Sequence, residues 1–200
     1  MKIAKKFMTL ALATALGVGC ATVGVSAAGS RTSAITVSAE QSTIYEVVQK
    51  IEETEGFADL QAELPAVADA FKQVNEGKME VADFVDVLKT LSEETTDEEV
   101  KAAIDELIQK LDGKEFVTGF DEFKVLDADK AEKNADGKYE VEISVPSITD
   151  TMENIQLVAY SKEDAKKWQI VDPISVDKEN KTLEVALDDG AFFTVVADAE

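Results

Sequence analysis

The spacing of apolar residues changes at Gly113, and this change constrains the fold more than any other feature of the sequence. Before Gly113, apolar residues recur every three or four positions, which is typical of amphipathic helices. After it, as from Tyr139 to Val145, they alternate with polar residues, which is typical of strands with one buried face. We therefore expect an α+β fold, with a small antiparallel helical bundle over residues 42–113 and an antiparallel β-sandwich over residues 114–200.

Start and stop signals divide the first of these regions into helices joined by short connections. They are a capping-box pattern at Thr43–Glu46 with a stop at Gly56, Pro65 as a helix start with a stop at Gly77, the apolar series from Val81 to Leu88, and a second capping-box pattern at Thr96–Glu99 with a stop at Gly113. Connections of a few residues favour antiparallel packing of neighbouring helices.

The second region contains several short segments that are typical of strands. They are Phe116–Val125, Tyr139–Val145, Ile155–Tyr160, Trp168–Val171, Thr182–Leu187 and Ala191–Val196, and the turn before the second is Asn134–Gly137. Short strands separated by turn residues predict a two-sheet arrangement.

Residues 1–28 have the pattern of an export signal. A basic start, Met1–Lys6, precedes an apolar core, Phe7–Val18, that is too short to span about 30 Å of hydrocarbon as a helix. Small residues then allow cleavage after Ala27 or Ala28, so we expect a secreted protein. The alternative is a membrane anchor that continues to Val25. Residues 29–41 are small and polar without a sustained period, and we interpret them as a flexible linker.

Cys20 follows the apolar core and raises the alternative of lipidation. A lipoprotein signal usually has leucine or a similar residue three positions before the cysteine, and here that position is Gly17. We therefore expect Cys20 to be discarded with the signal. If it is lipidated instead, the protein belongs to the cell envelope, as a sensor or a solute-binding accessory.

The charge of the chain narrows its range of partners. The sequence has 41 acidic and 20 basic residues, and residues 1–28 contain three lysines and no acid. The remaining 172 residues thus carry 41 acids and 17 bases, a formal charge of −24. Nucleic acids and anionic membranes need basic surfaces, so we expect neither as a partner. A charge of this sign favours cations and basic proteins.

The absence of histidine, together with a single cysteine in the leader, limits the chemistry of the exported chain. Zinc, copper and haem sites rely on these residues, and so do Ser-His-Asp and Cys-His nucleophilic mechanisms. No glycine-rich phosphate-binding motif is present either. A glycoside hydrolase with two carboxylates remains the alternative that residue types allow. We expect a protein that is not an enzyme and that has no cofactor.

Calcium is a metal that the abundant carboxylate oxygens of this chain could hold. Asp127 and Asp129 begin like an EF-hand loop, but the later ligand positions and the loop glycine are missing. Asp188 and Asp189 precede Gly190 in a segment that is equally typical of a plain turn. Both pairs are weak candidates for a Ca²⁺ site.

Three further features have a structural and a functional interpretation. Tyr160 and Trp168 could form a sugar-stacking platform, although a tryptophan in such a strand is more often part of the core. An apolar helix face could stay uncovered as a groove for a partner segment, although such faces usually form the core. The acidic run Glu93–Glu99 is explained by the favourable effect of negative charge at a helix N-terminus.

Four motifs lie between Val145 and Val196: Val145-Pro146-Ser147-Ile148-Thr149, Ala159-Tyr160-Ser161, Lys167-Trp168-Gln169-Ile170 and Val176-Asp177-Lys178-Glu179-Asn180-Lys181-Thr182. Together they resemble a module of secreted proteins of gut Firmicutes. The resemblance covers about a quarter of the chain. It implies an immunoglobulin-like or similar β-sandwich in an exported bacterial protein, and it supplies no active-site residues.

Together these features predict a secreted, non-enzymatic protein that acts through its surface as a binding or adhesion module. Its partner is expected to be a protein or a glycan of unknown identity, and contact with a membrane is expected only if Cys20 is lipidated.

Overall fold

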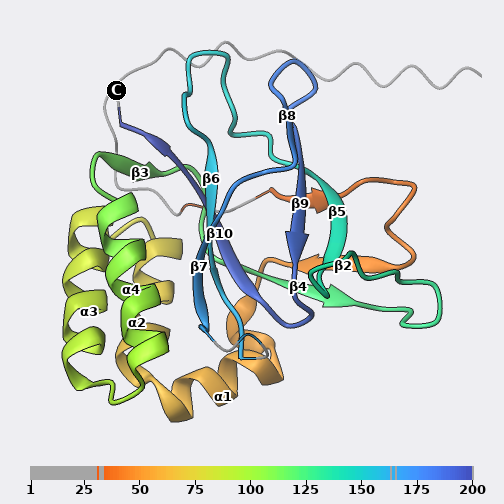
Figure 1. Ribbon diagram of the computed structural model, residues 1–200. Coiled ribbons are helices and arrows are strands. Elements are labelled where there is room, and N and C mark those ends of the chain that lie inside the picture. Colours follow the sequence, from red (N-terminus) through yellow and green to blue (C-terminus); the bar gives the residue numbers. More distant parts are fainter. Residues whose placement is uncertain (1–30, 32–33, 163, 165, 200) are drawn as a thin grey trace, which may run out of the picture.

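The computed structural model describes residue 31 and residues 34–162, 164 and 166–199 (Figure 1). These residues form an α+β fold with four α-helices and two antiparallel sheets. In chain order the elements are β1 (Thr36–Val37), β2 (Tyr45–Val48), a 3₁₀ turn (Ile51–Glu53), α1 (Glu55–Glu63), α2 (Pro65–Asn75), α3 (Val81–Glu94), α4 (Glu98–Lys110), β3 (Lys114–Phe116), β4 (Asp121–Val125), β5 (Tyr139–Ser144), β6 (Gln156–Tyr160), β7 (Trp168–Val171), β8 (Ser175–Asp177), β9 (Thr182–Leu187) and β10 (Phe192–Asp198).

Every pairing between these strands is antiparallel, and the two sheets differ in size. The four-stranded sheet has the order β1-β5-β9-β8. The six-stranded sheet has the order β2-β4-β10-β6-β7, and β3 pairs with the far end of β10. Because β10 pairs with β3, β4 and β6, it is the central strand of the larger sheet.

Two buried clusters of side chains cover opposite faces of the six-stranded sheet. On one face, Phe193 of β10 shares a cluster with Val141 and Val185 of the four-stranded sheet. On the other face, the neighbouring Phe192 shares a cluster with Phe71 of α2 and with side chains of the other helices. The six-stranded sheet is therefore the middle layer between the smaller sheet and the helices, which lie together along one side of the molecule in Figure 1.

This middle position explains the apolar run in β10. Its residues from Phe192 to Ala197 are all buried: Phe192 and Val196 belong to the helix-side cluster, and Phe193, Val195 and Ala197 belong to the sheet-side cluster. A strand that is covered on both faces lacks the alternation of apolar and polar residues that a half-exposed strand shows. By contrast, β5 has one exposed face and alternates from Tyr139 to Ser144.

Residues 29–48 correct two predictions. Within the expected linker, Ile35 is 1% exposed and Thr36–Val37 pairs with β5 as β1. The helix expected from Thr43 does not form, because Tyr45–Val48 is β2 and pairs with β4 in a register that sets Tyr45 opposite Val125. Tyr45 is buried and its ring lies 5.5 Å from that of Phe123, so packing against a distant strand overrides the local helical pattern.

The helices also differ from the expected bundle. They share their core with the six-stranded sheet, since Phe116, Phe120 and Trp168 belong to the helix-side cluster. Gly56 does not end a helix but lies in the first turn of α1, which starts after the N-cap Thr54. The helices thus form a layer over the sheet instead of packing around a core of their own.

Several elements are confirmed close to their expected bounds. They are α2, α3 and α4 among the helices, and β5, β6, β7, β9 and β10 among the strands. Gly77 and Gly113 follow α2 and α4 with positive φ angles of 67° and 75°, as stop residues do. The predicted strand Phe116–Val125 is split in two, and β8 was not expected. Asn75 holds the break between β3 and β4 by pairing with the backbone N–H and C=O of Phe120.

The predicted signal, its cleavage site and Cys20 lie outside the described residues. Within the part of the chain that is described, no helix is long and apolar enough to cross a membrane.

Candidate functional site: an apolar groove between α2 and α3

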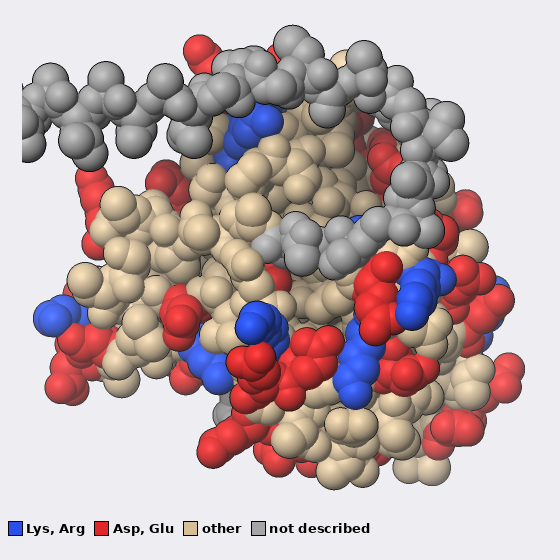
Figure 2. Space-filling view, turned by 180° about the vertical axis from the view of Figure 1, so that it is seen from behind, with Lys and Arg blue, Asp and Glu red and all other residues tan. Residues whose placement is uncertain are grey.

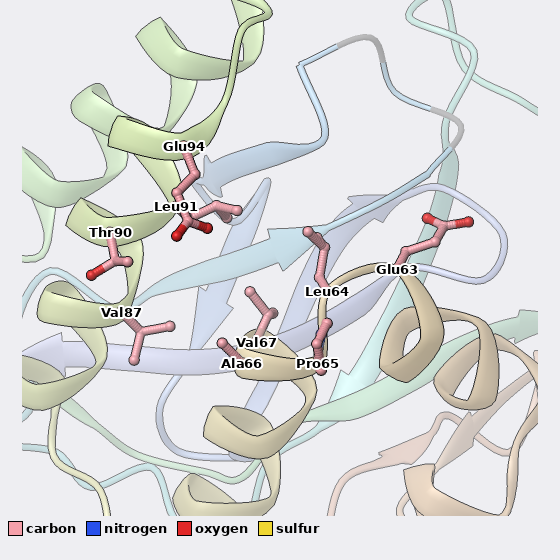
Figure 3. Close-up of a pocket in the computed structure, with 9 residues that line it drawn as sticks. All are labelled: Glu63, Leu64, Pro65, Ala66, Val67, Val87, Thr90, Leu91 and Glu94. Carbon is pink, nitrogen blue, oxygen red and sulfur yellow. The ribbon is translucent and has the colours of Figure 1, made fainter.

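The helical layer contains a shallow groove whose floor is apolar (Figure 3). One side is formed by the junction of α1 and α2, and the other by the C-terminal half of α3. The residues that line it are Glu63, Leu64, Pro65, Ala66, Val67, Val87, Thr90, Leu91 and Glu94. Its volume of about 250 Å³ lies below the roughly 300–1,000 Å³ of most small-molecule pockets. A groove of this size suits a few side chains of a partner.

The first side of the groove depends on a sharp change of direction between two helices. Leu64 ends α1 with a backbone that is no longer helical, at φ −132° and ψ 67°. Pro65 then begins α2, where its fixed φ suits the first turn and its missing N–H costs no helical hydrogen bond. This junction leaves Leu64 half-buried over the groove, while Val67 packs into the core.

The second side is an apolar ridge on α3. The core face of this helix is formed by Val81, Phe84 and Leu88, which are all buried. Val87 and Leu91 lie four residues apart on an adjacent face and are only partly buried. Side chains with this spacing stack along a helix as a ridge against which another helix can pack. The apolar surface of α3 is thus wider than its contact with the sheet requires.

Acidic side chains lie at both sides of the groove. Glu63 ends α1, and its carboxylate lies 3.2 Å from Lys162 Nζ, which also lies 3.5 Å from Asp59. Glu94 ends α3 and forms no ion pair with any described residue. Among the described residues, the lining has these two carboxylates and no basic side chain. Acidic side chains are also widespread over the face of the molecule in Figure 2.

The structure corrects our explanation of the acidic run Glu93–Glu99. Only its second half lies at a helix N-terminus: Asp97 caps α4 by accepting from the N–H groups of Glu99 and Val100, and Glu98 and Glu99 lie in the first turn. Glu93 and Glu94 instead end α3, whose last turn has no basic residue. Negative charge at a helix C-terminus is unfavourable, so helix stability does not account for these two residues.

A row of side chains beneath the helices contains two buried polar atoms without a hydrogen bond. The strand register places Glu122, Phe192, Tyr160 and Trp168 side by side across β4, β10, β6 and β7. Among the described residues, the Glu122 Oε2 and Tyr160 Oη atoms are buried and lack a hydrogen-bond partner. Lys124 Nζ lies 3.4 Å from Glu122 Oε2, close enough for an ion pair but not aligned as a hydrogen bond.

The environment of Tyr160 shifts the pKa of its phenol. Burial, reinforced by the negative charge of Glu63, raises the pKa of its phenol to about 12. An uncharged phenol in an apolar layer is inert near neutral pH, and no nucleophile or base that would use it is within hydrogen-bonding distance among the described residues. All four side chains of this row are buried, so the row is part of the core of the protein.

The proposed sugar platform is contradicted by burial. Tyr160 and Trp168 are each 1% exposed, and their rings meet at 4.9 Å between centroids. Trp168 also contacts Phe71 edge-on, at 6.2 Å. Because helices cover this face of the sheet, neither ring offers a surface on which a sugar could stack.

Three of the four aspartates considered for calcium are engaged in other contacts. Asp127 lies 2.7 Å from Lys130, and this hydrogen-bonded partner lowers the pKa of its carboxyl group. Asp188 lies 3.1 Å from Lys138, and Asp189 accepts a hydrogen bond from the N–H of Val125. Asp129 is exposed in the turn that follows β4.

No group of three or more acidic, cysteine or histidine residues in the described part of the chain could hold a metal ion. The structure thus assigns Asp127, Asp188 and Asp189 to ion pairs and turns, and it does not bring either aspartate pair together with a third acidic ligand.

Sequence reasoning anticipated that a helix face could remain uncovered, but it did not identify the residues. One signal was available, because α3 has apolar residues at 84, 85, 87, 88 and 91, an arc wider than a single core face needs. Comparison of the chain with protein-family models, with curated proteins and with solved structures finds no match.

Proposed function

We propose that this is an exported, non-enzymatic binding protein that holds an apolar segment of a partner protein in the groove between α2 and α3. The basic and apolar pattern of residues 1–28 supports export. The exported chain has no histidine and no cysteine, which supports binding over catalysis. The larger hollows elsewhere are lined by mixtures of charged and apolar residues, as between α3 and α4.

The single observation that carries this proposal is the uncovered apolar floor of the groove. Leu64, Val87 and Leu91 remain partly exposed beside a fully buried core. Covering apolar surface stabilises a complex by roughly 25 cal/mol per Å², so a partner segment that fills the groove gains binding energy there. Grooves between helices commonly receive such segments.

We also propose an immunoglobulin-like β-sandwich for the two sheets, with one strand exchanged. In that fold the sheets have the orders A-B-E-D and G-F-C-C′. Here β1-β5-β9-β8 takes the first order and β4-β10-β6-β7 the second, with β5 to β10 following in sequence as B, C, C′, D, E and F. The G position is taken by β4, which precedes β5 in the chain. The resemblance of Val145–Val196 to modules of secreted Firmicutes proteins agrees with this arrangement.

Binding is tested with a designed amphipathic helical peptide whose leucines repeat at positions i, i+4 and i+7. Methyl NMR spectra of the full-length protein are recorded as the peptide is added. We expect shifts at Leu64, Val67, Val87 and Leu91, and loss of binding in Leu91→Asp. The matched control is Leu126→Asp, because Leu126 is 55% exposed but lies outside the groove.

Leu91→Asp could weaken the fold, so Thr90→Trp provides a second variant. Thr90 is exposed at the edge of the groove, and a large ring there would occupy the space without removing a core side chain. Shifts that spread over the surface, or binding that survives both variants, would contradict the proposal.

Export and anchoring are separated by mass spectrometry of the protein from its native host. A chain that begins at Ala28 or Gly29 supports a released protein. A diacylated Cys20 at the N-terminus would instead make it an envelope lipoprotein, the alternative that the leader leaves open.

A further inference from the structure

We infer that the segment held in the groove is a cationic amphipathic helix, a specificity that rests on the proposed function. Three observations support this inference: the charge of the groove, the position of that charge on α3, and the shape of the α3 ridge. The first two are independent of the apolar floor that carries the proposed function, and the third concerns the arrangement of its residues on α3.

The groove presents negative charge on both sides. Glu63 and Glu94 line it, and no lysine or arginine does. Lys162 neutralises part of the charge on Glu63, at 3.2 Å, whereas Glu94 has no cationic partner among the described residues. Glu94 is therefore the carboxylate that is available to a basic side chain of a partner.

The acidic residues are placed where they disfavour the helix that carries them. Glu93 and Glu94 occupy the C-terminal end of α3, where unpaired backbone carbonyls already give negative potential. The same end of the helical layer carries Asp97, Glu98 and Glu99 at the start of α4. A cation bound beside Glu94 would meet the carboxylate and the carbonyl end of α3 together, so a positively charged partner relieves a conflict that is present in the unbound protein.

The shape of the groove favours a helix over an extended strand. Its α3 side is the ridge of Val87 and Leu91, with Thr90 between them at the i+3 position. A helix packs against such a ridge by placing its own i, i+4 side chains in the adjoining groove. An extended segment gains most of its affinity from the backbone of a sheet edge, and the groove offers no strand edge.

The experiment compares three helical peptides that share the same leucine positions and differ only in their flanking charged positions, which are lysine, glutamine or glutamate. Affinity for the full-length protein is measured by calorimetry at 50 and 500 mM NaCl. We expect the lysine peptide to bind about tenfold more tightly than the glutamine peptide at low salt, with most of the difference lost at high salt. We expect the glutamate peptide to bind most weakly.

Two matched pairs of variants locate the effect. Glu94→Gln is expected to lower the affinity for the lysine peptide about three- to fivefold. Glu93→Gln, at the same end of α3 but outside the lining, is expected to leave this affinity unchanged. Glu63→Gln is expected to lower the affinity for the lysine peptide less than Glu94→Gln does, because Lys162 already pairs with Glu63. Its control is Asp59→Asn, which also removes a partner of Lys162 but does not line the groove.

Equal binding of all three peptides, with loss of binding in Thr90→Trp, would overturn the cationic specificity and leave the proposed function standing. The absence of binding by any of the three peptides would contradict the proposed function itself. Self-association of the protein that Thr90→Trp abolishes would also overturn the inference, because a second copy would then occupy the groove.

Discussion

The two faces of the six-stranded sheet are covered in different ways. The smaller sheet covers one face, where Phe193 and Val195 pack against Val141 and Val185. The helices cover the other face, where the groove opens and where, among the described residues, Glu122 and Tyr160 have buried atoms without a hydrogen bond.

The groove of the proposed function lies on the helix side of the molecule. A layer whose buried polar atoms are hydrogen-bonded and whose apolar side chains are covered contributes to stability alone. On the helix side, apolar side chains stay uncovered and acidic side chains disfavour the helix that carries them. A binding partner would explain both features. The following predictions test the contrast.

The largest effect is expected for the two phenylalanines that are adjacent in β10 but face opposite layers. Phe193→Ala should lower the free energy of unfolding by about 3–5 kcal/mol, because Phe193 is fully buried between two hydrogen-bonded sheets that cannot close the cavity. Phe192→Ala should cost about 1 kcal/mol less, because the helices can shift toward the space. Urea denaturation followed by circular dichroism measures both. A larger loss for Phe192→Ala would reverse the contrast.

A second test uses the close approach of Gly56 to Glu122. A Cβ atom at Gly56 would lie 2.5 Å from Glu122 Oε1, so Gly56→Ala should be destabilising although alanine favours helices. In a Glu122→Ala background the same change should be neutral or stabilising. The double-mutant cycle should thus give a coupling of about 1–2 kcal/mol by urea denaturation. Additive effects would show that Glu122 moves aside freely.

A third test compares the buried tyrosines of the two faces. Tyr160→Phe should raise stability by about 1 kcal/mol near pH 7, because it removes a buried hydroxyl that has no hydrogen-bond partner among the described residues. Tyr45→Phe should give no such gain, because the Tyr45 hydroxyl is not one of the buried atoms without a hydrogen bond in the described part of the chain. Thermal unfolding at neutral pH measures both, and a loss in Tyr160→Phe would indicate a partner for its hydroxyl.

The raised pKa of Tyr160 also gives a pH dependence. The phenol ionises near pH 10 in the unfolded chain and at about 12 in the folded protein, so the unfolded state releases its proton first as the pH rises. Below pH 10 the phenol is neutral in both states and the free energy of unfolding is unaffected. As the pH rises to 12, the free energy of unfolding should fall by up to about 3 kcal/mol. Tyr160→Phe should remove that part of the alkaline loss, which urea denaturation across this range measures.

The smallest effect is expected for the two halves of the acidic run. Glu94→Gln should raise the melting temperature slightly at low salt, because it removes negative charge from the C-terminal end of α3. Glu99→Gln should lower it slightly, because Glu99 lies in the first turn of α4. Both shifts should disappear in 0.5 M NaCl. Shifts of the same sign would contradict opposite roles for the two halves.

Local signals predicted the elements that are long or strongly patterned. The helix α4 has a cap at Asp97 and a stop at Gly113, and β5 alternates over six residues, so both could be located from the sequence. The strand β2 could not, because Ile44, Val47 and Ile51 are spaced as in a helix. Its partner β4 begins more than seventy residues later, and no local pattern reports such a pairing.

The sequence predicted that an apolar helix face could stay uncovered, but it did not predict which residues form the groove. The breadth of the apolar arc on α3 indicated surplus apolar surface, but the part of it that stays uncovered depends on how far Leu64 and Val67 reach across from the α1–α2 junction. Tyr160 and Trp168 were weighed as a platform because their strands were recognised, while the layer that covers them was not.

By itself the sequence determined that the chain is strongly acidic, that it has no histidine, and that helices and strands form at most positions where the apolar period is sustained. Only the tertiary structure decided that strands precede the helices, that one sheet is buried on both faces, and that Glu94 lies beside an apolar groove. It also placed Glu94 at the C-terminal end of a helix, where negative charge is unfavourable. These features arise from contacts between residues that are distant in the chain, and the free energy of such contacts does not appear in any local pattern.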